Sequence, residues 1–244
     1  MERARLTRYG LLSITGDDAR EFLHAQLTRD IRALPADRAA LAGWCSAKGR
    51  LLASLLVIPA PQGFLLQLSR DLAAPVAKRL SMFVLRSKVK VADESGQWVQ
   101  DGLWDVDSDA PEVAWKDGVA TVKVGERRAL QIGPASGMTA APTAPEEAWT
   151  LQEIRAGRPL ITSATQDQFV PQMVNLEKLG GIDWQKGCYP GQEIVARAQY
   201  RGQVKRRMVQ LHVPAGTELS PGQEYQGGVV VDRAGDEVLA VMPI

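Results

Sequence analysis

The chain has 244 residues, 45% of them hydrophobic and 23% charged, which is typical of a globular protein with one large or two small domains. Its 29 basic and 28 acidic side chains leave a net charge of +1, so any nucleic-acid or membrane partner must bind a local patch. The longest apolar run, residues 51–60, is too short to span a bilayer, and no signal-peptide core follows residues 1–5. We therefore expect a cytoplasmic protein.

The first third of the chain predicts a mixture of strands and helices. Strand-like runs occur at residues 10–15, 41–45, 51–58 and 64–68. Asp17 is expected to cap a helix whose apolar residues recur on one face, at Ala19, Phe22, Leu23 and Leu27. A second helix is expected after Ser69, with apolar residues repeating every four positions at Leu72, Val76 and Leu80.

The remainder predicts antiparallel strands and one more helix. Residues 87–132 contain short alternating runs separated by Asp, Gly and Ser clusters, a pattern that favours an antiparallel sheet. Residues 133–145 are rich in proline and small residues and indicate a connector, followed by a helix at 146–156. Strand-like runs near the end occur at residues 208–213, 228–231 and 238–241. Together these elements predict an α+β fold.

Residues 186–193, KGCYPGQE, form the strongest candidate site and are called the KGC motif below. Glycines flank Cys188 closely, and Pro190 fixes its own φ, so the thiol is expected on a stiff bend. Lys186 lies two residues before Cys188, and an extended backbone would place both side chains on one face. An ammonium group there favours the thiolate, so Cys188 and Lys186 are the candidate catalytic pair.

Cysteine and histidine usage limits the other chemistries. Cys45 and Cys188 are the only two cysteines, which are too few to hold an iron–sulfur cluster with about four protein ligands. A single cysteine is more often a small buried hydrophobe than a reactive group. The residues around Cys188 favour the reactive role for this cysteine. The sequence places neither His24 nor His212 beside the thiol, so a cysteine–histidine hydrolase is disfavoured.

The KGC motif, together with residues 179–184 and 195–198, resembles the signature of the YgfZ family of folate-binding proteins, Lys-Gly-Cys-aromatic-x-Gly-Gln-Glu. Every fixed position of that signature matches. Residues 11–30, 45–50 and 155–176 resemble further blocks of the same family. Members resemble the glycine-cleavage T-protein, an aminomethyltransferase, in fold, and they support iron–sulfur enzymes and some transfer-RNA modification.

The resemblance implies three modules around a central hole. Residues 1–47 and 146–202 would form a discontinuous folate-binding domain, and residues 48–145 a ferredoxin-like module. Residues 203–244 would form a short C-terminal β-barrel-like module. The expected fold is therefore α+β of the T-protein type.

The resemblance also implies tetrahydrofolate or a derivative as the ligand. A pterin stacks on aromatic rings, and its tail carries carboxylates that favour basic side chains. The family places aromatic residues against the ligand at Trp149 and Tyr9, although an isolated Trp or Tyr is more often a packing residue. The candidate ligand-binding residues within and after the KGC motif are Tyr189, Gln192, Glu193 and Arg197.

One local basic patch follows the KGC motif. It carries five positive charges within eleven residues and no acid, at Arg197, Arg201, Lys205, Arg206 and Arg207. The patch is a candidate for a polyglutamate tail, or for direct contact with transfer-RNA phosphates. The alternative is a solvated strand face without a partner.

We therefore expect a folate-binding accessory protein in which Cys188 handles a redox, one-carbon or cluster-transfer step for iron–sulfur client enzymes. Two alternatives remain open: a tetrahydrofolate-dependent aminomethyl or methyl transferase, and a scaffold without chemistry. The T-protein uses an aspartate near the block that corresponds to Lys48 and Gly49, whereas no Asp or Glu occurs here between Arg38 and Arg70. Loss of such a carboxylate argues against aminomethyl transfer. No resident metal is expected.

Overall fold

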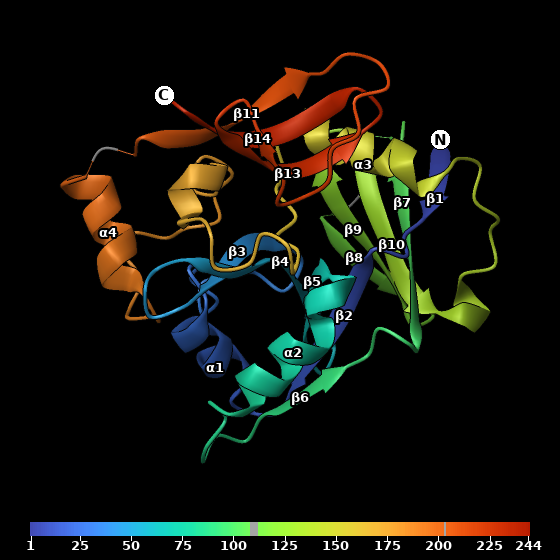
Figure 1. Cartoon of the computed structure of the whole chain (residues 1–244). Helices are drawn as coiled ribbons and strands as arrows, with labels where there is room; N and C mark the ends of the chain where they lie inside the picture. Colours follow the sequence, from blue (N-terminus) through green and yellow to red (C-terminus); the bar gives the residue numbers. More distant parts are fainter. Residues whose placement is uncertain (108–111, 203) are drawn as a thin grey trace. The chain divides into compact units, whose positions relative to one another are not determined.

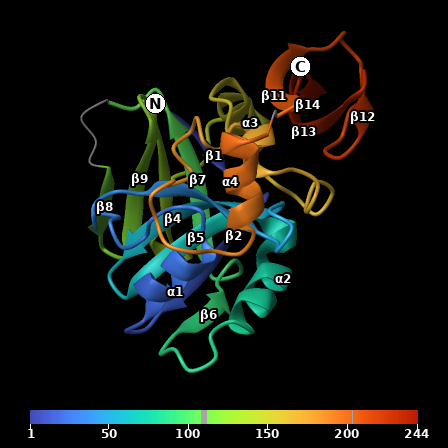
Figure 2. The same cartoon turned by 90° about the vertical axis from the view of Figure 1, so that its left-hand side faces the viewer.

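The computed structural model describes residues 1–107, 112–202 and 204–244, and within them the chain forms three sheets, four α-helices and two short 3-10 helices (Figures 1 and 2). The sheets have the strand orders β1-β7-β10-β9-β8, β11-β14-β13-β12 and β3-β4-β5-β2-β6. Strands in the first two sheets pair antiparallel. The α+β prediction is confirmed.

The chain divides into two compact units. Unit 1 comprises Met1–Phe22, Arg32–Ala40 and Leu56–Trp149, and unit 2 comprises Leu23–Ile31, Leu41–Leu55 and Thr150–Ile244. The boundary falls within helices α1 (Ala19–Gln26) and α3 (Glu146–Arg155) and within strands β3 (Ala40–Cys45) and β4 (Leu51–Ala60). These units do not follow the three expected modules one for one, and the three-module division stays a prediction.

Unit 1 contains most of the strands and one complete α-helix. Its complete elements are β1 (Glu2–Arg5), β2 (Tyr9–Thr15), β5 (Gly63–Ser69), α2 (Arg70–Ser81), β6 (Lys90–Asp93), β7 (Trp98–Trp104), β8 (Val113–Lys116), β9 (Val119–Gly125), β10 (Arg128–Pro134) and η1 (Ala135–Gly137). Helix α2 packs against β2 and β6 (Figure 1). Its four-residue apolar repeat explains this packing, because Leu72, Val76 and Leu80 are all buried.

The sheet β1-β7-β10-β9-β8 is stabilised by a buried ion cluster. Asp101 on β7 is fully buried and accepts hydrogen bonds from Arg3 at 2.7 Å and Arg5 at 2.5 Å, both on the neighbouring strand β1. A buried carboxylate needs such partners, since its desolvation would otherwise be costly. The cluster therefore pins β1, an edge strand of this sheet, to its neighbour β7.

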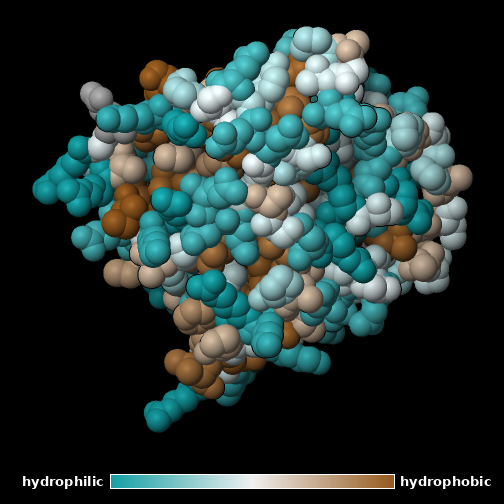
Figure 3. Space-filling model, viewed as in Figure 1, coloured by the Kyte–Doolittle hydropathy of each residue, from teal (hydrophilic) through white to brown (hydrophobic). Residues whose placement is uncertain are grey.

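The turn that follows α2 leaves large apolar side chains in solvent. Met82, Phe83 and Leu85 are exposed, and Leu85 has a positive φ of 46°. Figure 3 shows hydrophobic side chains at this turn, at the foot of the view.

Unit 2 contains the KGC motif and the C-terminal sheet. Its complete helices and strands are η2 (Pro171–Val174), α4 (Gln192–Tyr200), β11 (Arg206–His212), β12 (Glu224–Tyr225), β13 (Gly228–Ala234) and β14 (Glu237–Pro243), and it holds nearly all of β3 (Ala40–Cys45). Val230, Val238 and Ala240 form the centre of a small apolar core on the C-terminal sheet. The strands expected near the end of the chain are confirmed as β11, β13 and β14, and their grouping into a β-barrel-like module stays a prediction.

The predicted helices α1, α2 and α3 are confirmed, and two local expectations are wrong. Helix α1 begins at Ala19, and Asp17 forms an exposed ion pair with Lys88 at 3.3 Å instead of capping the helix. Helix α4 was not expected from the sequence, which suggested only a bend followed by a strand face. Arg197 therefore lies on a helix, while Arg206 and Arg207 lie on β11.

Candidate functional site

The KGC motif presents one exposed thiol between two buried anchors. Cys188 is exposed, whereas Lys186 and Tyr189 on either side are only 7% and 8% exposed. The segment has no regular secondary structure before α4 begins. The buried neighbours fix the backbone on both sides of Cys188, so the thiol is held out to solvent by a well-anchored turn.

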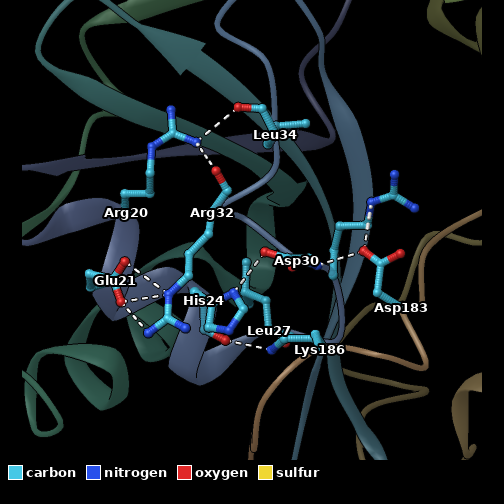
Figure 4. A network of polar contacts seen from close by, with 10 residues as sticks. Arg20, Glu21, His24, Leu27, Asp30, Arg32, Leu34, Asp183 and Lys186 are labelled. Carbon is cyan, nitrogen blue, oxygen red and sulfur yellow. Dashed lines mark hydrogen bonds and ion pairs between the residues drawn. The ribbon is translucent and has the colours of Figure 1, made fainter.

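Lys186 anchors the motif to the end of helix α1. Its ammonium group donates hydrogen bonds to the carbonyls of His24 at 2.5 Å and Leu27 at 2.6 Å (Figure 4). The same ammonium lies 4.8 Å from the ring centroid of Tyr189. A cation suits a helix C-terminus, where carbonyl groups lack intrahelical partners. These contacts give Lys186 a structural task, and its predicted effect on the ionisation of Cys188 stays a prediction.

Two glycines allow the motif to pack against the loop that follows β3. Gly191 has φ +78°, and a Cβ there would lie 2.3 Å from the carbonyl oxygen of Ser46. A Cβ on Gly49 would lie 2.7 Å from Ile194. Residues 45–50 and the motif, two blocks far apart in the sequence, therefore meet in unit 2 at a contact that only glycine permits.

Tyr189 connects the motif to the second cysteine. Cys45 is buried at the end of β3, and its desolvation raises its pKa to about 12. Burial also raises the pKa of Tyr189 well above its usual range, with a smaller contribution from the charge of Cys45. Both groups therefore stay protonated at neutral pH and serve as packing groups, and a ligand role for Tyr189 stays a prediction.

Helix α4 displays the polar residues of the candidate ligand site. Glu193 and Arg197 are exposed and lie one turn apart on the same side of the helix, while Val195 is buried beneath them. Gln192 is half-buried in the first turn. Figure 3 shows hydrophilic side chains over this helix, at the left edge of the view.

The basic patch contains fewer exposed charges than the sequence suggested. Arg207 donates to the carbonyl of Gln172 at 2.8 Å and pairs with Glu177, and Arg206 donates to the carbonyl of Gly227 at 3.1 Å. These two guanidinium groups hold β11 in place. The exposed basic residues that remain are Arg197, Arg201 and Lys205.

Trp149 and Tyr9 belong to unit 1 and are packed as core residues. Trp149 is only 1% exposed, and its ring lies against Gly102, where a Cβ would approach within 2.3 Å. Tyr9 is buried at the start of β2. These contacts agree with the alternative that both rings are packing residues. Contact of either ring with a pterin stays a prediction.

His24 is the residue that the sequence argument missed. A Cβ on Gly187 would lie 3.5 Å from Nε2 of His24, so the structure places a histidine against the KGC motif. Nδ1 of His24 lies 2.9 Å from a carboxylate oxygen of Asp30, whose backbone N–H donates to Asp183 at 2.7 Å (Figure 4). The sequence alone did not indicate that a histidine lies beside this segment.

A second feature that the sequence did not reveal is an aromatic pair beside α4. Trp184 and Tyr200 meet edge to face with their ring centroids 5.9 Å apart. Tyr200 is exposed and lies on the same helix as Arg197. Arg197 and Tyr200 are three residues apart, so their side chains lie on one side of α4.

Comparison with known proteins shows the family. The tRNA-modifying protein YgfZ of Serratia proteamaculans (strain 568) is 32% identical over 260 residues, covering 94% of this chain and 79% of that protein. The chain belongs to the YgfZ family. The protein of the same description from Escherichia coli O127:H6 is 30% identical over 243 residues, covering 91% of this chain and 74% of that protein.

Comparison of structures shows the fold of this YgfZ family member. The crystal structure of the glycine cleavage system aminomethyltransferase T from Bartonella henselae matches with a TM-score of 0.74 at 15% identity, covering 99% of this chain and 78% of that chain. The predicted T-protein-like fold is confirmed. A scan against models of protein families finds no match. None of the helices in the described part of the chain is long and apolar enough to cross a membrane.

Proposed function

We propose that this protein is a folate-binding accessory factor that supports iron–sulfur client enzymes, including enzymes of transfer-RNA modification. The observation that carries the proposal is the exposed thiol of Cys188, held between the buried side chains of Lys186 and Tyr189. The name of the relatives, tRNA-modifying protein, supports the link to transfer RNA. A thiolate is both a nucleophile and a metal ligand, so Cys188 is suited to a transient step on a client or its cluster.

The residues on α4 fit a folate better than the aromatic residues of unit 1 do. The exposed carboxylate of Glu193 suits the N–H groups of a pterin, and Gln192 can both donate and accept hydrogen bonds. Arg197 suits the carboxylates of the tail. Trp149 is already packed against Gly102, so α4 carries the proposed contacts. When bound, a reduced folate supplies one-carbon units or reducing equivalents.

The protein's own contribution is to orient one reactive group. Lys186 holds the start of the turn on the carbonyls of α1, and Gly191 allows the end of the turn to pack on Ser46. These anchors restrict the backbone of Cys188 without covering its side chain. A thiol held in this way can meet a client protein without a large ordering cost.

The proposal is tested in cells that lack the protein, by measuring the activity of an iron–sulfur enzyme that modifies transfer RNA. Cys188→Ala should fail to restore that activity while retaining its circular-dichroism spectrum and its binding of tetrahydrofolate in calorimetry. Cys45→Ala is the matched control and should restore activity. Full restoration by Cys188→Ala would refute a working role for the thiol, and the absence of measurable tetrahydrofolate binding would refute the folate role.

Aminomethyl transfer is the second candidate, and the T-protein-like fold favours it. Against it, the chain from Arg38 to Arg70 contains no carboxylate that could assist proton transfer. Incubation of the purified protein with a labelled aminomethyl donor and tetrahydrofolate distinguishes the two functions. We expect no labelled methylenetetrahydrofolate above background, and catalytic turnover would favour the transferase.

A further inference from the structure

His24 is an unusual buried histidine because only one of its ring nitrogens has a partner. The residue is 4% exposed, and Nδ1 lies 2.9 Å from a carboxylate oxygen of Asp30. Nε2 is buried and has no hydrogen-bond partner among the residues that the structure describes. Buried polar atoms in folded proteins are nearly always hydrogen-bonded, so an unsatisfied one needs an explanation.

The free nitrogen faces the backbone immediately before Cys188. Nε2 lies 3.5 Å from the position that a Cβ on Gly187 would occupy. Apart from the two chain neighbours of Gly187, no other described heavy atom lies within 4 Å of that position. The side of Gly187 that faces His24 is therefore uncrowded. A larger residue at position 187 would contact the imidazole directly.

We propose that His24 is the proton acceptor for the thiol of Cys188 and that Asp30 is its positioning residue. This inference rests on the proposed role of Cys188 as the working group. In the step, the S–H bond breaks, its electron pair remains on sulfur as the thiolate, and the proton binds Nε2. The imidazolium then donates through Nδ1 to the Asp30 carboxylate, and no other reactant is required.

The geometry supports this assignment in two ways. Consecutive Cα atoms are about 3.8 Å apart, so Cys188 lies one residue from the position that faces Nε2 of His24. A base oriented by a third group through its other nitrogen is the arrangement that activates nucleophiles in proteins. Two further hydrogen bonds hold the backbone of His24 and Asp30. Lys186 donates to the carbonyl of His24, and Asp183 accepts from the N–H of Asp30.

The charges around His24 suit the transfer of a proton to it. Asp30 faces Nδ1 directly, and Asp183 lies behind Asp30 and pairs with Arg29 at 3.1 Å. Lys186 donates to the carbonyl of His24, and its positive charge opposes protonation of the ring, so the Asp30 carboxylate is the group that favours the imidazolium. Glu21 is the acid one turn earlier on the same helix. The imidazolium that forms would therefore have a carboxylate as its immediate partner.

The test is the rate at which iodoacetamide alkylates Cys188 in the full-length protein, followed by peptide mass spectrometry over a range of pH. At about pH 7 an ordinary thiol is largely protonated, whereas at about pH 10 it is largely ionised. We expect His24→Gln to alkylate about tenfold more slowly than wild type at about pH 7 and equally fast at about pH 10. Asp30→Asn should slow the reaction about threefold at about pH 7 only.

Two further variants keep the test decisive. His212→Gln is the matched control, because that histidine is exposed on β11 and far along the chain from the motif, and it should react as wild type does. Gly187→Ala has an ordinary φ and places a methyl group 3.5 Å from Nε2, so it should slow alkylation at about pH 7 even if His24→Gln does not fold.

The inference is overturned if the variants of His24, Asp30 and Gly187 that fold leave the rate at about pH 7 unchanged. It is also overturned if they lower the rate equally at both pH values, because that result indicates changed access to the thiol. The measurement needs neither folate nor a client, so its failure leaves the proposed function standing. Conversely, a fully active Cys188→Ala protein in cells would refute the working role of the thiol in the proposed function, whatever the alkylation rates.

Discussion

Cys45 and Cys188 lie in the same compact unit and have opposite environments. Cys45 ends β3, is buried, and has a pKa raised to about 12. Cys188 is exposed on a turn between Lys186 and Tyr189, which are themselves buried. The difference arises from the backbone, since the side chain of a strand residue can be enclosed by its sheet, whereas a turn anchored at both ends presents its middle residue.

The contrast separates two tasks within the KGC motif. Lys186, Tyr189 and Gly191 are used to fix the motif on α1 and on the loop after β3. Cys188 is exposed and is left available. We therefore expect substitutions of the anchors to lower stability, and substitution of Cys188 to change reactivity alone.

The largest expected effect is the difference in reactivity between the two thiols. In the native protein at about pH 8, iodoacetamide should modify Cys188 at least about a thousandfold faster than Cys45, because Cys45 reacts only after local unfolding. Peptide mass spectrometry of a time course measures both rates in one sample. In guanidinium chloride the two rates should converge. Similar rates in the native protein would contradict the comparison.

Gly191 should be the most sensitive anchor of the motif. Gly191→Ala combines a left-handed φ of 78° with a Cβ 2.3 Å from the carbonyl oxygen of Ser46. We expect the free energy of unfolding to fall by about 3 kcal/mol or more, from the strained backbone and the overpacked contact together. Chemical denaturation measures the change.

Gly157→Ala provides the control for that experiment. Gly157 has φ +63°, but no heavy atom lies within 4 Å of the position of a Cβ, so only the backbone strain remains. Its cost should be about 1 kcal/mol. Equal losses in the two variants would show that the contact between Gly191 and Ser46 is not what holds the motif.

Most of the fold could be predicted from local patterns. The four-residue repeat of Leu72, Val76 and Leu80 predicted α2, and the short alternating runs of residues 87–132 predicted antiparallel strands, of which β9 is one. Helix α4 was missed because the Pro190-Gly191 pair indicates a turn and no side chain caps the helix, whose N-cap is Gly191 in a left-handed conformation. Packing of Val195 in the core of unit 2 supplies what the local signal lacks.

The candidate site was only half predictable for a different reason. The KGC motif is a contiguous signal, so Cys188 and Lys186 could be singled out from the sequence alone. His24 is 162 residues from Lys186, and a histidine within an amphipathic helix gives no sign of what it will face. Only the fold brings the end of α1 to Gly187, and this is why the partner of the motif was found in the structure.

Substitution of Lys186 tests whether its buried ammonium group stabilises the KGC motif. Lys186→Met removes the donor from the carbonyls of His24 and Leu27, and a buried unsatisfied acceptor costs about 1–3 kcal/mol. We expect a loss of about 2 kcal/mol in the free energy of unfolding, measured by denaturation. Lys178→Met, at an exposed position nearby in the sequence, should change stability by less than about 0.5 kcal/mol. A neutral Lys186→Met would show that the ammonium group only fills space.

Cys45 sets the smallest expected effect, which is a loss of stability in alkaline solution. The unfolded chain releases this proton near its model value of 9.0, whereas the folded protein retains it to about 12. Between these values the unfolded state binds fewer protons, so stability should fall as pH rises, by about 1.4 kcal/mol per pH unit for one such group, with no loss below about pH 9. Burial of Tyr189 lowers stability in the same direction above about pH 10.

Denaturation at about pH 8 and about pH 10 should therefore show a smaller decrease in the free energy of unfolding for Cys45→Ala than for wild type, because the variant keeps the tyrosine contribution and loses that of the thiol. Equal decreases in the two proteins would mean that Cys45 is ionised within the fold, and the contrast between the two cysteines would then lose its physical basis.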